Sequence, residues 1–178
     1  MCDRKDELNR SRTVVEGGKT LLRPLLLFLA TGAGFGLSPV APGTVGTIWG
    51  VAISLLIKGS SSPALELTAA VLLVGLAVPL CSRAEEYLGK KDDRRIVADE
   101  YLTFPLCMLG ISPTLFHFLL AFGINRVLDI LKPPPARQAQ ELPRGWGVVA
   151  DDLVTSLYTL LLMHFLIRVG MPLLLGTP

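Results

Sequence analysis

Charged residues are scarce in this chain of 178 residues: they make up 18% of it, whereas a soluble domain averages about 25%. Aromatic residues are also few, at 7%, and the net charge of +2 is too small for the basic face of a nucleic-acid-binding protein. The three cysteines stand apart without a CxxC pair, so neither a disulfide framework nor a cysteine zinc site is indicated. Hydrophobic residues make up 51% of the chain, and this composition indicates an integral membrane protein.

Four apolar regions are long enough, or nearly so, to cross a bilayer core, which takes roughly 20 helical residues. Because polar residues collect between these regions, the sequence predicts an all-α, polytopic membrane protein with about four transmembrane helices plus re-entrant or broken helices. We expect a charged cytoplasmic arm over residues 1–23 and a single membrane-embedded domain over 24–178. The four apolar regions are 25–57, 63–80, 101–131 and 153–167.

Lysine and arginine side chains predict the orientation, because short connections that carry them stay on the cytoplasmic side. Most of these residues lie in the arm, in the segment 81–100 and in the segment 132–152, whereas Lys58 and Arg168 stand alone. We therefore expect the three polar segments to face the cytoplasm. Only one net crossing is then available between the arm and Lys58.

Proline and glycine interrupt the first apolar region in the stretch GFGLSPVAPGTVGT, residues 34–47. Pro39 and Pro42 remove backbone donors and disfavour helix. We therefore expect residues 38–44 to form a loop on the cytoplasmic side and residues 45–57 to cross the membrane. Irregular backbone near a membrane needs polar partners from protein or from a wet cavity, so this loop is predicted to line a site.

Five carboxylates fall at the predicted cytoplasmic edge of the membrane. Oxygen ligands without a nearby histidine or cysteine cluster favour a hard cation of the magnesium type, and neighbouring basic side chains suit phosphate. Hydroxyl groups of the proline–glycine stretch supply further donors. The candidate metal-binding and catalytic residues are Asp99, Glu100, Asp129, Asp151 and Asp152, and the candidate substrate-binding residues are Ser38, Thr44, Thr47, Arg126 and Lys132.

Purely structural roles would also explain these carboxylates. The pairs Asp99-Glu100 and Asp151-Asp152 each precede apolar sequence, where an acidic residue caps a helix and complements its dipole. Asp129 lies near the C-terminal end of its expected helix, where the dipole disfavours a carboxylate. Its structural alternative is an ion pair with Arg126 or Lys132, each three residues away.

Several phosphatase motifs are missing from the sequence. There is no C-x5-R loop, no D-x-D-x-T stretch and no K-x6-R-P motif of the histidine-dependent lipid phosphatases. Water activated by a metal ion is the route to phosphate-ester hydrolysis that these absences leave.

Four motifs, in this order, resemble those of the phosphatidylglycerophosphatase A family: GFGLSPVAPGTVGT, IVADE, NRVLDILKPPP and GWGVVADDLV. The resemblance implies a magnesium-dependent lipid phosphatase of the bacterial cytoplasmic membrane, with its active site facing the cytoplasm. Such an enzyme hydrolyses phosphatidylglycerol phosphate to phosphatidylglycerol in phospholipid biosynthesis. The resemblance also implies that the five carboxylates form the metal and catalytic set, that Arg126 and Lys132 bind phosphate, and that Ser38, Pro39, Pro42, Gly43, Thr44 and Gly46 belong to the substrate loop.

Other functions stay open at the level of sequence. A transporter also places carboxylates near broken helices, although usually at mid-membrane and in paired halves. A phosphatidyl-transferring enzyme would need a D-G-x2-A-R helix, which the sequence lacks, and a non-catalytic membrane protein of the same fold is a further alternative. The choice of catalytic base is also open, as is a covalent aspartyl-phosphate at Asp129 or Asp151.

Overall fold

The structure is a computed structural model that describes residues 22–60 and 62–170, so most of the predicted charged arm lies outside the described residues. Helices dominate, and no strand occurs within these two ranges, which confirms the all-α class. A helical segment at 22–30 precedes the labelled elements. These are η1 (Phe35–Leu37), α2 (Pro42–Lys58), α3 (Pro63–Leu88), α4 (Ala98–Thr103), η2 (Phe104–Met108), α5 (Leu115–Leu131), α6 (Ala136–Ala139), α7 (Gly145–Phe165) and the π-helical turn η3 (Leu166–Gly170).

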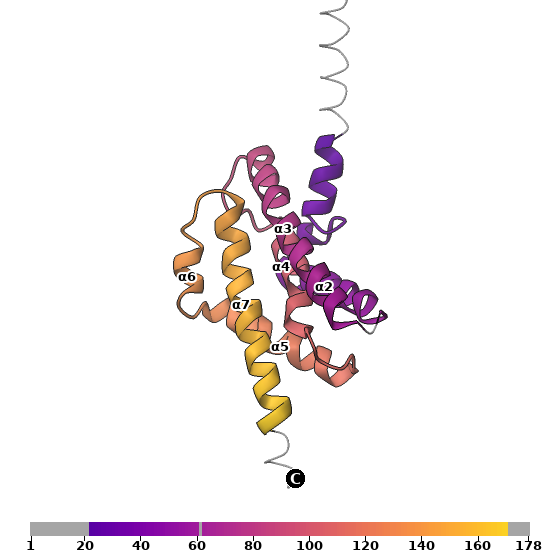
Figure 1. The fold of residues 1–178 in the computed structure, drawn as a ribbon. Helices are drawn as coiled ribbons and strands as arrows, with labels where there is room; N and C mark the ends of the chain where they lie inside the picture. The colour runs from indigo at the N-terminus through magenta and orange to yellow at the C-terminus, as the bar shows by residue number, and fades with distance from the viewer. Residues whose placement is uncertain (1–21, 61, 171–178) are drawn as a thin grey trace, which may run out of the picture.

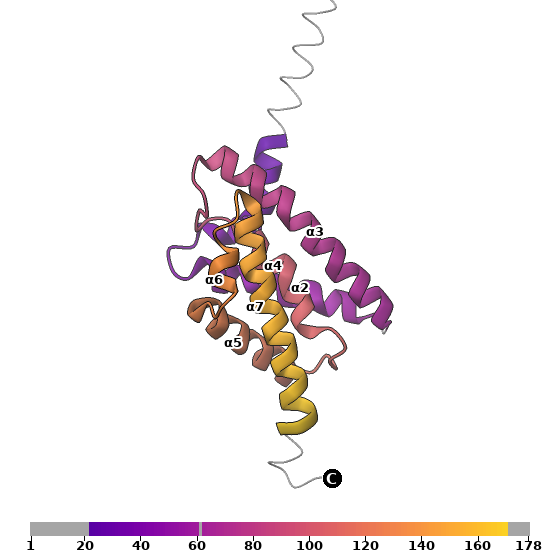
Figure 2. The same cartoon turned by 60° about the vertical axis from the view of Figure 1, so that its left-hand side comes forward.

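Helix α7 runs along most of the length of the molecule (Figure 1). Its N-terminal half packs on α3, and its remaining length packs on η2 and α5 (Figure 2). The short helix α4 lies at the centre, in contact with α2, α3 and α7. Helix α4 is therefore held from three directions, and this arrangement fixes the side chains that it carries.

Only two helices of the described part are long and apolar enough to cross a membrane, Pro63–Leu88 and Gly145–Gly170. These are fewer than the four that the sequence predicts. Helices α2 and α5 have 17 residues each. The start of the third apolar region, 101–131, does not form a long helix. It forms the end of α4 and η2, and Phe104, Cys107 and Met108 are fully buried in protein.

Three predicted helix boundaries are wrong. Pro42 opens α2 rather than lying in a loop, because proline needs no backbone donor in the first turn of a helix. Helix α3 continues past residue 80 to Leu88, where Gly89 ends it with a left-handed φ of 69°. Helix α7 begins at Gly145, so Asp151 and Asp152 lie in its second turn and do not cap its N-terminus.

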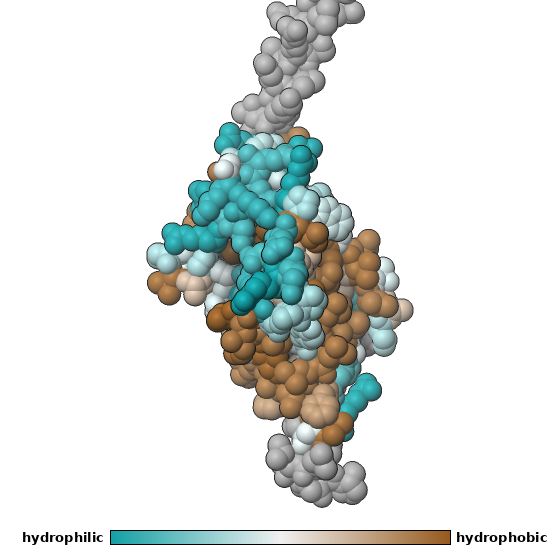
Figure 3. Space-filling view, turned by 90° about the vertical axis from the view of Figure 1, so that its left-hand side faces the viewer, coloured by the Kyte–Doolittle hydropathy of each residue, from teal (hydrophilic) through white to brown (hydrophobic). Residues whose placement is uncertain are grey.

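Small and polar residues face inward along α2, whereas large apolar ones face outward. A Cβ atom added to Gly46 or Gly50 would lie 2.6 Å from the Cβ atom of Val97 or Phe104, respectively, so glycine allows α2 to approach the central segment this closely. On the outer face, Ile48 and Leu56 are exposed. Figure 3 shows hydrophobic residues over much of one face of the molecule, and hydrophilic residues gathered at the end where α7 begins.

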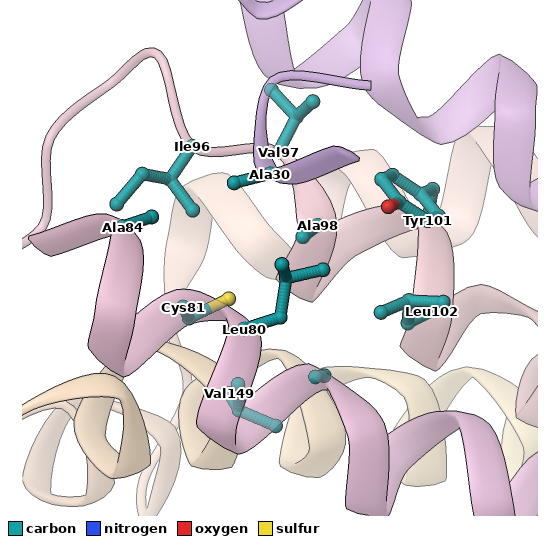
Figure 4. Packing of buried hydrophobic residues seen from close by; sticks show 11 residues of the cluster. Ala30, Leu80, Cys81, Ala84, Ile96, Val97, Ala98, Tyr101, Leu102 and Val149 are labelled. Carbon is teal, nitrogen blue, oxygen red and sulfur yellow. The ribbon is translucent and has the colours of Figure 1, made fainter. Parts of the chain in front are cut away.

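Two clusters of buried hydrophobic residues support the centre of the fold. One joins α3, α4 and the segment 22–30 and includes Leu80, Val97 and Leu102 (Figure 4). The other joins η2, α5 and α7 around Phe104 and Met163. Together they hold the termini of four helices around one polar cavity.

Candidate functional site

A polar cavity of about 180 Å³ lies where the N-terminal end of α2, the central helix α4, the C-terminal end of α5 and the second turn of α7 meet. The structure brings all of the predicted carboxylates to this cavity, although they come from three different helices. The predicted carboxylates in its lining are Asp99, Glu100, Asp129, Asp151 and Asp152, and Lys132 lines it as well.

Three carboxylates are placed so that they could hold one metal ion. Oxygen atoms of Asp129, Asp151 and Asp152 all lie within 4.8 Å of one another. Nearby, Asp99 Oδ1 and Glu100 Oε2 are buried without a hydrogen-bond partner among the described residues. Buried carboxylate oxygens without a partner are costly, and a hard divalent cation with oxygen ligands would satisfy them.

Arg126 links its own helix, α5, to two other helices at this site. Its guanidinium forms ion pairs with Asp129, on the same helix, and with Glu100 Oε1 of α4 at 3.4 Å. It also donates a hydrogen bond of 3.0 Å to Thr47 Oγ1 on α2. The ion pair expected as the structural alternative for Asp129 therefore exists, and Asp129 lines the cavity as well.

Lys132 reaches the cavity from a strained backbone. It ends α5 in a left-handed conformation, with φ of 46°, and its ammonium group pairs with Asp151. A left-handed lysine costs roughly 1–2 kcal/mol relative to a relaxed one, and such strain concentrates at functional sites. A glycine here would avoid the strain but would leave Asp151 without its cation.

Burial disfavours ionisation of the carboxyl groups of α4. It raises the pKa of Asp99 well above its usual value, and the neighbouring charge of Glu100 acts in the same direction. Burial likewise raises the pKa of Glu100 to about 7, although the charge of Arg126 opposes this increase. At a pH at which an exposed carboxyl group is already charged, Asp99 and Glu100 therefore tend to keep a proton. A bound cation would instead stabilise their charged forms.

The predicted hydroxyl donors are less well placed. Ser38 is exposed, and its hydroxyl donates to the carbonyl of Val40. Neither Ser38 nor Thr44 is part of the cavity lining, whereas Pro42 and Gly43 are. Thr47 is buried outside the lining, where its hydroxyl accepts a hydrogen bond from Arg126 and donates one to the carbonyl of Gly43.

Two lining residues were not expected from the sequence. Asp92 and Arg94 lie in the segment between α3 and α4 and border the cavity. In the sequence they belong to a run of charged residues that is typical of a solvated loop. The sequence alone does not separate Asp92 and Arg94 from the other charged residues of this segment, and only the folded structure shows that they line the cavity.

Gly43 provides a first test of how tightly the cavity is built. A Cβ atom at this position would lie 2.0 Å from Glu100 Oε1, so Gly43→Ala must displace the carboxylate. We expect Gly43→Ala to lower catalytic efficiency by about 10- to 100-fold, because small displacements of positioned groups have effects of this size. Purified protein assayed for phosphate release would provide the measurement.

Gly123→Ala is the matched control for this substitution. Gly123 also lies within a helix, but a Cβ atom there would meet no atom within 4 Å. We expect this variant to keep full activity and to gain up to about 1 kcal/mol in stability. Equal activity of the two variants would show that Glu100 does not need its observed position.

The described residues form an all-helical protein with one cavity that combines clustered carboxylates with arginine and lysine, a composition suited to an enzyme that acts on phosphate esters. The family model of phosphatidylglycerophosphatase A matches residues 28–167. The chain belongs to this family and is a phosphatase.

Curated relatives agree with this family. The chain is 32% identical over 146 residues to phosphatidylglycerophosphatase A of Haemophilus influenzae, covering 81% of this chain and 89% of the relative. It is 28% identical over 163 residues to phosphatidylglycerophosphatase A of Escherichia coli, covering 89% and 92%. A Bacteroides thetaiotaomicron protein with the provisional name phosphatidylinositol-3-phosphatase is 28% identical over 147 residues, covering 78% and 91%. No solved structure is significantly similar to the chain.

Proposed function

We propose that this protein hydrolyses the terminal phosphomonoester of phosphatidylglycerol phosphate, giving phosphatidylglycerol and free phosphate, with Mg²⁺ as its cofactor. The observation that carries this proposal is the meeting of five carboxylates, Arg126 and Lys132 around one cavity. The names of two relatives support the choice of substrate, since both are called phosphatidylglycerophosphatase A.

The oxygen-rich donor set fits the proposed cofactor. Asp129, Asp151 and Asp152 are the residues that would hold it, because their oxygens converge and no histidine or cysteine is among them. Magnesium bound there would supply positive charge beside the transferring phosphoryl group. Arg126 and Lys132 would bind phosphate oxygens and stabilise the charge that develops on them.

Glu100 is suited to accept a proton from the attacking water. A general base works best when its pKa is close to the operating pH, and burial raises the pKa of Glu100 to about 7. Its Oε2 atom has no hydrogen-bond partner among the described residues and is therefore free to take the proton. Arg126 holds the other oxygen, Oε1, which fixes the direction of the carboxylate.

A location in the membrane would give the cavity access to a phospholipid substrate. Two helices of the described part are long and apolar enough to span a bilayer, and large apolar side chains cover much of the outer surface. The acyl chains of a phospholipid could then stay in the bilayer while the head group enters the cavity. In the proposed orientation this cavity faces the cytoplasm of the bacterium, as the distribution of lysine and arginine predicts.

Phosphate release from phosphatidylglycerol phosphate in detergent micelles is the direct test. We expect purified protein to release phosphate with Mg²⁺ present and to stop when a chelator removes it. Phosphatidic acid, which carries only one phosphate, serves as the comparison substrate for head-group preference. A folded protein that releases no phosphate with any divalent metal would contradict the proposal and favour a transporter or a non-catalytic protein.

The raised pKa of Glu100 also predicts a pH dependence of activity. Protonated Glu100 cannot accept a proton, so we expect kcat to fall about tenfold per pH unit once the pH drops below the pKa of Glu100 in the Mg²⁺-bound enzyme. That pKa lies below the cation-free value of about 7, because a neighbouring cation favours the charged carboxylate. In Glu100→Gln the remaining activity should be low and should no longer fall over this range. An unchanged pH profile in Glu100→Gln would assign the base to another carboxylate.

The stability of the folded protein should also depend on the ionisation of Glu100. It should decrease as the pH rises, whereas activity should increase. The folded pKa of about 7 exceeds the ordinary value of 4.5, so the unfolded chain releases this proton at lower pH than the folded one. In the cation-free protein, the stability linked to Glu100 is thus fully present below pH 4.5 and is lost as pH rises through 7. Thermal unfolding of the wild type and of Glu100→Gln, each with chelator, would reveal the difference.

A further inference from the structure

Asp92 is a cavity-lining carboxylate that the proposed chemistry has not yet used. Two hydrogen bonds of Asp92 hold it in place. Its backbone N–H donates to Glu85 Oε1 at 2.8 Å, and its Oδ2 atom accepts from Gln140 Nε2 at 2.8 Å. Next to it, the ammonium group of Lys91 donates to the carbonyl of Gln140 at 3.2 Å. With φ of 52°, Asp92 adopts a conformation that is unusual for a residue with a side chain.

Asp99 provides an independent sign that this cavity binds a ligand. Asp99 is only 6% exposed, and its Oδ1 atom has no hydrogen-bond partner among the described residues. Asp92 and Asp152 line the same cavity as Asp99. A cation bound near Asp99 would therefore have further carboxylates of the same cavity available as ligands.

We propose that the cavity holds two divalent cations rather than one. The first lies among Asp129, Asp151 and Asp152, and the second lies between Asp92 and Asp99, with Asp152 shared. This inference rests on the proposed phosphatase function, which it deepens. Two adjacent cations can hold the attacking and the leaving oxygen of a phosphoryl transfer at the same time.

The formal charge of the cavity supports a second cation. Six carboxylates line it, against two basic lining residues, Arg94 and Lys132, and the adjoining Arg126. With one divalent cation the group stays negative and repels a phosphate dianion, whereas with two it becomes positive and attracts it. Mutual repulsion among the carboxylates is also lowest when both positions are filled.

Gln140 acts as a positioning residue for Asp92 in this arrangement. It lies between α6 and α7, and its amide ties the segment that carries Asp92 to the start of α7. Groups that orient a metal ligand from behind change metal affinity by about 10- to 100-fold when they are removed. We expect Gln140→Ala to lower the affinity for the second cation by about this factor and to leave the affinity for the first cation unchanged.

Titration of the metal-free, full-length protein in detergent with Mn²⁺, followed by electron paramagnetic resonance, tests the proposal without relying on activity. The wild type should bind about two Mn²⁺ ions with the spectral coupling of a close pair. Asp92→Asn should bind about one, without that coupling. Asparagine tolerates a positive φ, so this variant is expected to keep its fold. Glu86→Gln, an exposed carboxylate on α3 outside the cavity, should behave like the wild type.

Binding of a single Mn²⁺ by the wild type, or of two by Asp92→Asn, would overturn the two-cation site. Phosphate release measured on the same preparations separates this outcome from failure of the proposed function. An active wild type with one bound ion would disprove only the second site. A wild type with two coupled ions and no phosphate release would support the cation pair and disprove the proposed reaction.

Discussion

Asp129→Asn is expected to abolish measurable phosphate release from phosphatidylglycerol phosphate. Asp129 is the only carboxylate that α5 contributes to the group of three, and it also pairs with Arg126. Asparagine keeps the shape of the side chain but removes its charge, so the cation would lose a ligand that no other residue of α5 replaces. We expect a loss of about 10³-fold or more in kcat, because charge stabilisation at a catalytic metal is worth several kcal/mol.

A matched control separates this effect from a general loss of acidic charge. Glu141 is an exposed carboxylate in the segment before α7, outside the cavity, and Glu141→Gln should keep wild-type activity. Both variants should unfold within a few degrees of the wild type when chelator is present. Full activity of a folded Asp129→Asn variant would show that Asp129 holds neither the cation nor the phosphate.

The sequence was sufficient to select these five carboxylates as site candidates, because each lies within or beside an apolar segment. Asp99, Asp129 and Asp151 come from separate motifs, yet all reach one cavity. Their helical context was harder to predict. Helix α7 starts early because Gly145 lets it approach α3 closely: a Cβ atom there would lie 2.4 Å from the backbone nitrogen of Ser82. This close approach depends on a helix that is distant in the sequence, so the local sequence pattern does not predict where α7 begins.

The number of spanning helices was overestimated for a similar reason. Apolar periodicity indicates burial, but it does not distinguish burial in lipid from burial in protein. Phe104 and Met108 belong to an apolar run that resembles the start of a crossing, and both are fully enclosed by neighbouring helices. Asp92 escaped prediction for the converse reason, because a charged loop shows no sign that it folds over a cavity.

Arg126→Lys is expected to lower kcat by about 10²-fold although it preserves the charge. The guanidinium contacts Glu100, Asp129 and Thr47 at once, and a single ammonium group cannot span all three. Removing one preorganised donor to a developing charge costs about 10²- to 10³-fold. Arg126→Ala should therefore lose at least as much activity as Arg126→Lys.

Cation binding by the same variants distinguishes two roles for Arg126. If it binds the transferring phosphate, Arg126→Ala removes a positive charge beside the carboxylates, and Mn²⁺ should bind as tightly as in the wild type or more tightly. If it mainly positions Glu100 and Asp129, Mn²⁺ affinity should fall in proportion to activity. Thr47→Val removes the 3.0 Å hydrogen bond from Arg126 and the 2.9 Å hydrogen bond that the Thr47 hydroxyl donates to the carbonyl of Gly43, and it should lower kcat a few-fold without changing Mn²⁺ affinity. We expect the first pattern, because carboxylates without their cationic partner form a stronger divalent site.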